Sequence, residues 1–199
     1  MSDKNSPLIL GTEPIGKLLT QYAIPAIIAM TASSLYNMAD SIFIGHGVGA
    51  MGIAGLALTF PLMNLAAAFG SLVGVGASTL VSVKLGQKDY EGANNVLGNV
   101  FMLNLIMGVA FSVVFLLFLD PVLYFFGASE QTISYARDYM RIILYGNVIT
   151  HMYLGLNSVL RSSGYPKMAM FATLLSVVVN CLLNPLFIFV LDWGIKGAA

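Results

Sequence analysis

Five long stretches without a charged side chain constrain the fold of this chain more than any other feature. Each has about 20 or more residues rich in Leu, Ile, Val, Phe, Ala and Met, which is the length that an α-helix needs to cross a bilayer. The stretches do not alternate polar and apolar residues, as the strands of a membrane barrel would. We therefore predict an all-α integral membrane protein with five transmembrane helices, near residues 18–43, 52–82, 92–118, 132–160 and 166–190.

Composition excludes most soluble classes of protein. Charged residues make up 9% of the 199 residues and apolar residues 58%, whereas soluble domains carry about 25% charged residues. Ordinary soluble enzymes and nucleic-acid-binding proteins are therefore excluded. Nine basic and nine acidic residues balance, so no polyanionic partner is indicated. We expect that the chain is not an enzyme, because nucleophile-elbow and metalloprotease motifs are missing. We also expect no metal site, because His46 and His151 are far apart and lack a third ligand.

The first 17 residues are polar and are predicted to form a cytoplasmic segment. They are not a cleavable signal, because the apolar run that follows is too long. The bias of Lys and Arg supports this orientation, since cytoplasmic loops carry an excess of both. We therefore predict a multi-pass protein of the plasma membrane with a cytoplasmic N-terminus. Six basic residues fall inside (Lys4, Lys17, Lys84, Lys88, Arg161, Lys167) and three outside (Arg137, Arg141, Lys196).

Polar side chains recur at helical spacing on single faces of the predicted helices. In the helix near 132–160, Tyr139 and Asn157 share one face. Such stripes can enclose a hydrated cavity, and hydrogen bonds at ordinary helix contacts are the alternative explanation. The longest stripe, in the helix near 166–190, consists of Thr173, Ser176, Asn180 and Asn184.

Asp40 is the only acidic residue well inside an apolar run. A carboxylate at the membrane centre costs about 2.5–3.5 kcal/mol, so burial favours its neutral form. With oxygens of Tyr36, Asn37 and Ser41 nearby, Asp40 can exchange a proton or bind a cation. The alternative is a structural residue that reaches water near the end of the helix. Pro25 can bend the same helix, because it removes a backbone hydrogen bond.

Several short segments, in this order and spacing, resemble the multidrug and toxic compound extrusion (MATE) family of transporters. Asp40–Gly45 is similar to the family's Asp-x-hydrophobic-Phe-hydrophobic-Gly, and Asn180–Pro185 to its Asn-x-x-Leu-Asp/Asn-Pro. Each segment alone is weak, and the set together is specific. The other matching segments are 58–62, 74–77, 85–89 and 160–166.

The resemblance implies one lobe of a transporter with two six-helix lobes and no cofactor. Such transporters work by alternating access, and they exchange H⁺ or Na⁺ for cationic or amphipathic compounds. Many prokaryotic members have Asp where this chain has Asn184, which makes protonation of Asp40 alone more plausible than a tight Na⁺ site. The residues implied are Asp40, Asn180 and Asn184 for ion coupling, and Tyr36, Tyr139 and Asn157 for a supporting polar shell.

Residues 18–199 are accordingly predicted to form the N-terminal lobe of such a transporter. We expect the chain to stop at the start of the sixth helix, and the C-terminal lobe of the same protein to be its partner. Two alternatives stay open. A lipid-linked oligosaccharide flippase of the same superfamily usually has more basic residues along its cavity than this chain has. A membrane structural subunit without transport activity would not need Asp40 inside an apolar run.

Overall fold

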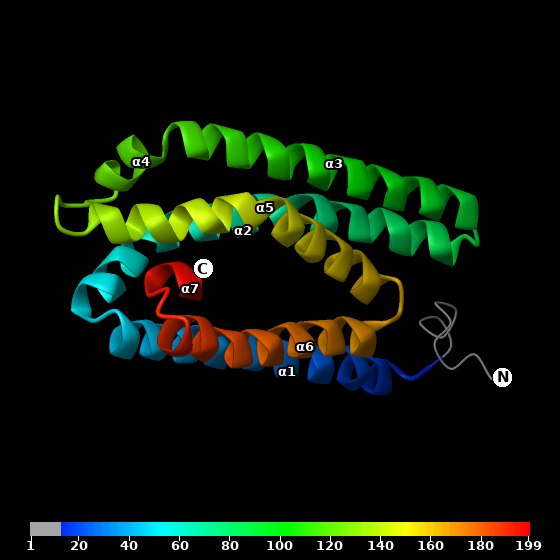
Figure 1. The fold of residues 1–199 in the computed structure, drawn as a ribbon. Helices are drawn as coiled ribbons and strands as arrows, with labels where there is room; N and C mark the ends of the chain where they lie inside the picture. Colours follow the sequence, from blue (N-terminus) through cyan, green and yellow to red (C-terminus); the bar gives the residue numbers. More distant parts are fainter. Residues whose placement is uncertain (1–12) are drawn as a thin grey trace.

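The computed structural model describes residues 13–199, which are almost entirely helical (Figure 1). Long apolar segments fold this way in a membrane because a helix satisfies its own backbone hydrogen bonds. The elements are α1 (Ile15–Gly47), α2 (Ala50–Gly86), α3 (Tyr90–Leu117), α4 (Leu119–Phe125), α5 (Ile133–Ser162), α6 (Pro166–Pro185), the π-helix η2 (Leu186–Val190) and α7 (Ile195–Ala198).

The long helices lie in two layers (Figure 1). One layer contains α2, α3 and α5, and the other contains α1 and α6, which run side by side in the same direction. The short helix α7 lies between the layers, where it contacts α1, α5 and η2. α1 packs chiefly against α6 and only slightly against α2, the next helix in the chain. The pair formed by α1 and α6 is therefore a distinct part of the lobe.

Glycines allow α2 and α5 to pack closely at their crossing. A Cβ atom on Gly74 would lie 2.5 Å from the Cα atom of Gly155, so no side chain fits there. Small residues serve this purpose in membrane proteins, where helix association depends on close packing. Beyond the crossing, this layer has an apolar core that includes Leu62, Phe111, Leu123, Met140 and Leu144.

The short helix α4 was not predicted, and it occupies the connection between α3 and α5. Pro121 stands in its first turn, where a missing N–H breaks no helical hydrogen bond. Leu119 and Leu123 of α4 are buried in the core. The Asp120 carboxylate accepts two hydrogen bonds from the Arg137 guanidinium of α5, at 2.7 and 2.8 Å. α4 thus closes one end of the three-helix layer.

Asp89 is the N-cap residue of α3, at the opposite end of that layer. Its side chain accepts a 2.8 Å hydrogen bond from the backbone N–H of Gly92, as a helix N-cap does. Lys84, in the last turn of α2, donates to the same carboxylate at 2.7 Å. The bond from Lys84, and after it the bond from Gly92, hold the pKa of Asp89 below its ordinary value. The tight connection between α2 and α3 is therefore fixed by one carboxylate.

Four helical segments are long and apolar enough to cross a membrane: α1, α2, α3 and the continuous segment Pro166–Val190. They correspond to four of the five predicted spans. The fifth, predicted near 132–160, is present as α5, which carries Asn147, His151 and Asn157 in its otherwise apolar part and is less apolar than the others. The count of five spans therefore stays a prediction.

The N-terminal boundary also differs from the prediction. α1 begins at Ile15, so residues 15–17 of the predicted polar segment belong to the helix. Lys17, in the first turn of α1, forms an exposed ion pair with Glu13 one turn earlier. The rest of the predicted segment, residues 1–12, lies outside the described residues.

Candidate functional site

Asp40 is buried where α1 meets the end of α6. Only 7% of this residue is exposed, and Asn184 is 5% exposed. The Asp40 Oδ1 atom accepts a 2.6 Å hydrogen bond from Asn184 Nδ2, which also donates to the Tyr36 hydroxyl at 3.4 Å. Within residues 13–199 no basic side chain forms an ion pair with Asp40. The hydrogen-bond partner of this carboxylate is thus a neutral amide.

The local sequence explains why α6 ends beside Asp40. Pro185 follows Asn184 directly and has no N–H to donate to the carbonyl of Cys181, so the α-helical hydrogen-bond pattern cannot continue through it. The next five residues, Leu186–Val190, form the π-helix η2. Such π-helical turns are rare and often mark functional sites. The change in helix type places Asn184 in the last regular turn, facing α1.

Apolar side chains surround Asp40 on the side of α7. Ile44, one turn after Asp40, is fully buried, and Ile188 of η2 packs against it. Gly47 makes this approach possible, because a Cβ atom there would collide with Ile188. Tyr139 of α5 belongs to the same cluster and is 3% exposed. The other layer therefore contributes one aromatic side chain to this apolar cluster.

Asn180 and Asn157 form their hydrogen bonds away from Asp40. Asn180, one turn before Asn184, is exposed and donates to a backbone carbonyl of its own helix at 2.9 Å. Asn157 donates to the backbone carbonyl of Ala169 at 3.1 Å and so connects α5 to the second turn of α6. The structure thus joins Asp40, Asn184 and Tyr36 by hydrogen bonds and packs Tyr139 in the apolar cluster of Ile44 and Ile188. Asn180 and Asn157 form their hydrogen bonds elsewhere.

The number of residues between Tyr139 and Asn157 alone could have excluded that both belong to one site. The two residues share a face of α5, but at 1.5 Å per residue they lie about 27 Å apart along the axis. Two side chains that far apart cannot both contact one carboxylate. Pro25, the predicted bending point, is buried near the first third of α1, which continues through it as one helix.

The polar stripe of α6 connects both layers. At its start, the Thr173 hydroxyl bonds the Tyr153 hydroxyl of α5 at 2.7 Å, and at its end Asn184 contacts α1. Ser176 and Asn180 are exposed between these two contacts. Because the four residues share one face of the helix, the exposed amide of Asn180 lies on the same side of α6 as Asn184.

A second group of buried polar side chains, between α3 and α5, was missed in the sequence. Asn147 Nδ2 donates to the carbonyl of Gly108 and to the Ser112 hydroxyl, both at 3.3 Å. Ser112 donates to the Leu144 carbonyl at 2.8 Å, and His151 Nδ1 lies 3.0 Å from the Asn147 carbonyl. The spacing of 147 and 151 on one face of α5 was the signal that could have found this group. It joins α3 to α5 away from Asp40.

The model of the MatE family matches residues 25–186, which include Tyr36, Asp40 and Asn184. The match spans well over half of the chain. The chain belongs to the MatE family. Its family agrees with the resemblance found in the sequence.

Three relatives illustrate the similarity to other family members. Multidrug export protein MepA of Staphylococcus haemolyticus (strain JCSC1435) is 31% identical over 185 residues, which cover 93% of this chain and 41% of MepA. An outward-facing structure of a multidrug resistance MATE family transporter of the MOP superfamily has a TM-score of 0.92 at 32% identity, covering 100% of this chain and 43% of that one. A crystal structure of MATE in the bent conformation has a TM-score of 0.91 at 33% identity, covering 100% and 44%.

These matches confirm the predicted fold, an all-helical MATE N-terminal lobe. The chain spans less than half of the length of the relatives that it matches. The names of these relatives describe a multidrug export protein and a multidrug resistance transporter.

Proposed function

We propose that this chain is the N-terminal lobe of a secondary active transporter that exports cationic or amphipathic compounds in exchange for H⁺ or Na⁺. Membership of the MatE family and the similarity to a protein named as a multidrug exporter support this proposal. Alternating access in two-lobed transporters moves one lobe against the other around a shared site. The proposed activity therefore belongs to a protein that contains a second lobe as well.

The observation that carries the proposal is a buried carboxylate that forms no ion pair with a basic side chain of residues 13–199. Asp40 accepts its hydrogen bond from the neutral amide of Asn184. An ionised carboxylate in an apolar environment is costly unless it is paired. Binding of a proton or a cation removes this cost, so the free energy of this part of the lobe depends on whether the ion is bound. We propose Asp40 as the coupling residue, with Asn184 as the amide that holds the carboxylate after the ion has left.

Ion binding at Asp40 would change the contact between α1 and α6. Asn184 donates to the carboxylate and to Tyr36, and neutralising Asp40 weakens the charge-assisted bond. A ligand shifts a conformational equilibrium only through its different affinities for the two states. We propose that this difference is expressed in α1, which can bend at Pro25. One related structure is described as the bent conformation, in support of this idea.

We also propose that α5 is a fifth transmembrane helix. With 30 residues it is about 45 Å long, which is sufficient to cross a bilayer. Its polar residues Asn147 and His151 are buried against other helices, where lipid does not contact them. Five crossings, with the basic residues Lys84, Lys88 and Arg161 on the side of the N-terminus, fit a cytoplasmic N-terminus in the plasma membrane.

Efflux from vesicles tests the coupling role. The experiment reconstitutes the two-lobed protein that contains this chain and measures ethidium export under an imposed H⁺ gradient and then an imposed Na⁺ gradient. Asp40→Asn should abolish gradient-driven export at matched protein amounts, because the side chain keeps its shape but can no longer bind the ion. Asp120→Asn is the control, since Asp120 is bound to Arg137 and lies outside the site. Export by Asp40→Asn at the wild-type rate, with the same gradient dependence, would overturn the proposal.

A further inference from the structure

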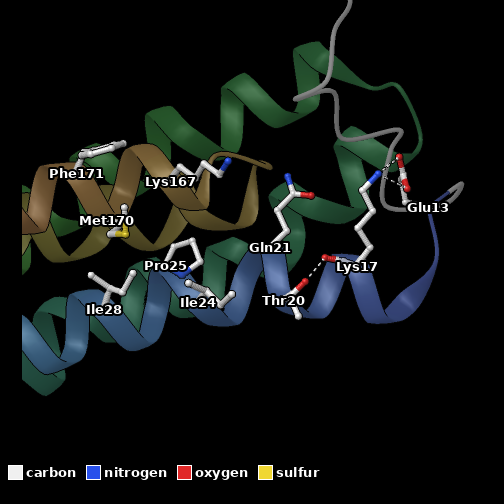
Figure 2. Close-up of a pocket in the computed structure, with 10 residues that line it drawn as sticks. All are labelled: Glu13, Lys17, Thr20, Gln21, Ile24, Pro25, Ile28, Lys167, Met170 and Phe171. Atoms are coloured by element: carbon white, nitrogen blue, oxygen red, sulfur yellow. Dashed lines mark hydrogen bonds and ion pairs between the residues drawn. The ribbon is translucent and has the colours of Figure 1, made fainter.

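A groove of about 740 Å³ lies between the first halves of α1 and α6 (Figure 2). It is at the opposite end of the two helices from Asp40: Lys17, in the groove, and Asp40 are about 35 Å apart at 1.5 Å per residue. The proposed ion site around Asp40 does not include this groove, although Pro25, the proposed bending point of α1, is one of its lining residues. Its lining is divided into a polar part, formed by the first turns of the helices, and an apolar part further along them.

The polar part of the groove carries a net positive charge. Lys17 is bound to Glu13 at 2.8 and 2.9 Å, so these two charges compensate each other. Lys167, in the first turn of α6, is exposed and forms no ion pair within residues 13–199. In the view of Figure 2 the Gln21 amide lies between the ammonium groups of Lys17 and Lys167, and the Lys167 side chain extends toward Gln21. One acidic and two basic groups leave one positive charge for an anion.

The apolar part of the groove continues from the charged turn toward the middle of the helices. On α1 it is formed by Ile24, Pro25 and Ile28, and on α6 by Met170 and Phe171 (Figure 2). Both helices begin at the same end of the lobe and are apolar enough to cross a membrane. With both helices spanning the bilayer, as the proposed function requires, the charged end would lie at the level of lipid headgroups and the apolar end in the hydrocarbon.

We propose that this groove binds one anionic phospholipid. The phosphate contacts Lys167, Lys17 and the Gln21 amide, and one acyl chain lies along Ile24 and Phe171. Basic pockets between transmembrane helices on the cytoplasmic side suit anionic headgroups. A soluble phosphate would contact the polar part alone. A lipid in the bilayer would fill both parts, with its headgroup at the charged end and its acyl chain at the apolar end. The charge and the division of the lining thus favour a lipid.

Native mass spectrometry of the purified protein in detergent tests this proposal without any transport measurement. The probes are palmitoyl-oleoyl phosphatidylglycerol, phosphatidylcholine with the same acyl chains, and glycerol 3-phosphate. We expect one saturable phosphatidylglycerol adduct, bound about fivefold more tightly than phosphatidylcholine, because a lysine near an anionic surface contributes about that factor. Lys167→Gln should remove this preference, and Lys167→Arg should restore it.

Two further variants separate the groove from general effects of charge. Lys88→Gln removes an exposed lysine at the same end of the lobe but outside the groove, and it should leave phosphatidylglycerol binding unchanged. Phe171→Ala shortens the apolar wall and should weaken binding of both lipids. Because Lys167 and Phe171 are exposed, neither substitution disturbs a core.

Three results would overturn the proposal. Equal phosphatidylglycerol affinity in Lys167→Gln and Lys88→Gln would show that the charge of the groove is not involved. Displacement of the lipid by an equal concentration of glycerol 3-phosphate would identify a site for a soluble phosphate. An adduct that forms only after removal of residues 1–12 would identify that segment, rather than lipid, as the occupant. Each result is independent of whether Asp40 couples transport to an ion.

Discussion

Replacing Asn184 with Asp would introduce a second carboxylate beside Asp40. In the structure the Asn184 amide nitrogen lies 2.6 Å from Asp40 Oδ1, where it donates a hydrogen bond. In Asn184→Asp an oxygen that cannot donate takes its place. Two adjacent carboxylates cannot both stay ionised without a proton or a cation between them. We therefore expect the substitution to convert a charge-assisted hydrogen bond from a neutral amide into a site that requires an ion.

The distance sets the size of the effect. At an effective dielectric constant of about 20, two unit charges 2.6 Å apart repel by about 6 kcal/mol. Protonating one of two carboxyls with an ordinary pKa near 4 costs only about 4 kcal/mol at pH 7. This cost is smaller than the repulsion, so we expect one carboxyl to be protonated. The folded variant then binds one more proton than the unfolded chain. The decrease in its free energy of unfolding relative to the wild type should become smaller by about 1.4 kcal/mol for each unit by which the pH falls. The decrease should become larger again as the pH rises.

Thermal unfolding in detergent, followed by circular dichroism, measures this effect. For a chain of this size about 4 kcal/mol corresponds to a decrease in Tm of about 8–16 °C at pH 7, which acidification to pH 5 should largely reverse. If Na⁺ replaces the proton, a concentration of 100 times its Kd should restore about 2.7 kcal/mol, whereas choline at equal ionic strength should not.

Asn180→Asp is the matched control for this experiment. It makes the same change one turn earlier in α6, at an exposed side chain that bonds only its own helix. Its Tm should change little with pH or Na⁺ between pH 5 and 7. If Asn184→Asp responded to pH and Na⁺ no more than Asn180→Asp does, the geometry described for Asp40 would be wrong.

Three further predictions concern the framework of the lobe. Gly74→Ala should destabilise the fold by about 1–3 kcal/mol through overpacking, whereas Gly76→Ala should not, because a Cβ atom there meets no other atom within 4 Å; equal Tm values would refute the close crossing. Since the pKa of Asp89 is held below its ordinary value, its stabilising effect is present at neutral pH and is lost below about pH 4; a wild-type Tm no more sensitive to acid than that of Asp89→Asn would contradict this. Tyr153→Phe and Thr173→Val should each cost about 1 kcal/mol and be non-additive, because the two hydroxyls bond each other at 2.7 Å, and strictly additive losses in a double-mutant cycle would show that they do not.

The pattern of the sequence predicted the long helices well because their apolar length is a local property. The predicted ends of the span near 92–118 differ by two residues or fewer from α3. The sequence pattern did not predict α4, because seven residues are too few to show an apolar period. This helix is held by contacts with α5, among them the bond from Arg137 to Asp120. The same limit applies to η2, since Pro185 indicates a break in α6 but not that a π-helix follows it.

The candidate site was predictable only in part, because periodicity tells which face of a helix a residue occupies and not which helix that face meets. Asp40 stood out by its charge, and Tyr36 and Asn184 by their spacing. Tyr139 and Asn157 shared a face of α5, but only Tyr139 reaches the cluster beside Asp40, while Asn157 bonds the Ala169 carbonyl. The interlayer position of α7 and the approach of Ile188 to Gly47 depend on tertiary contacts that no local pattern contains.

The arrangement of charge along α1 and α6 explains how two different ligands could be recognised by one pair of helices. Lys17 and Lys167 line the groove near the start of these two helices, and Asp40 and Asn184 are hydrogen-bonded near their end. At the interface an unpaired lysine is solvated by water and headgroups, so it can attract an anion without a large desolvation cost. Beside Asp40 a carboxylate is buried with a neutral partner, so it favours a cation or a proton. Because α1 packs mainly on α6 and little on α2, occupancy of either end acts first on the contact between these two helices, which is the contact that a bend at Pro25 would change.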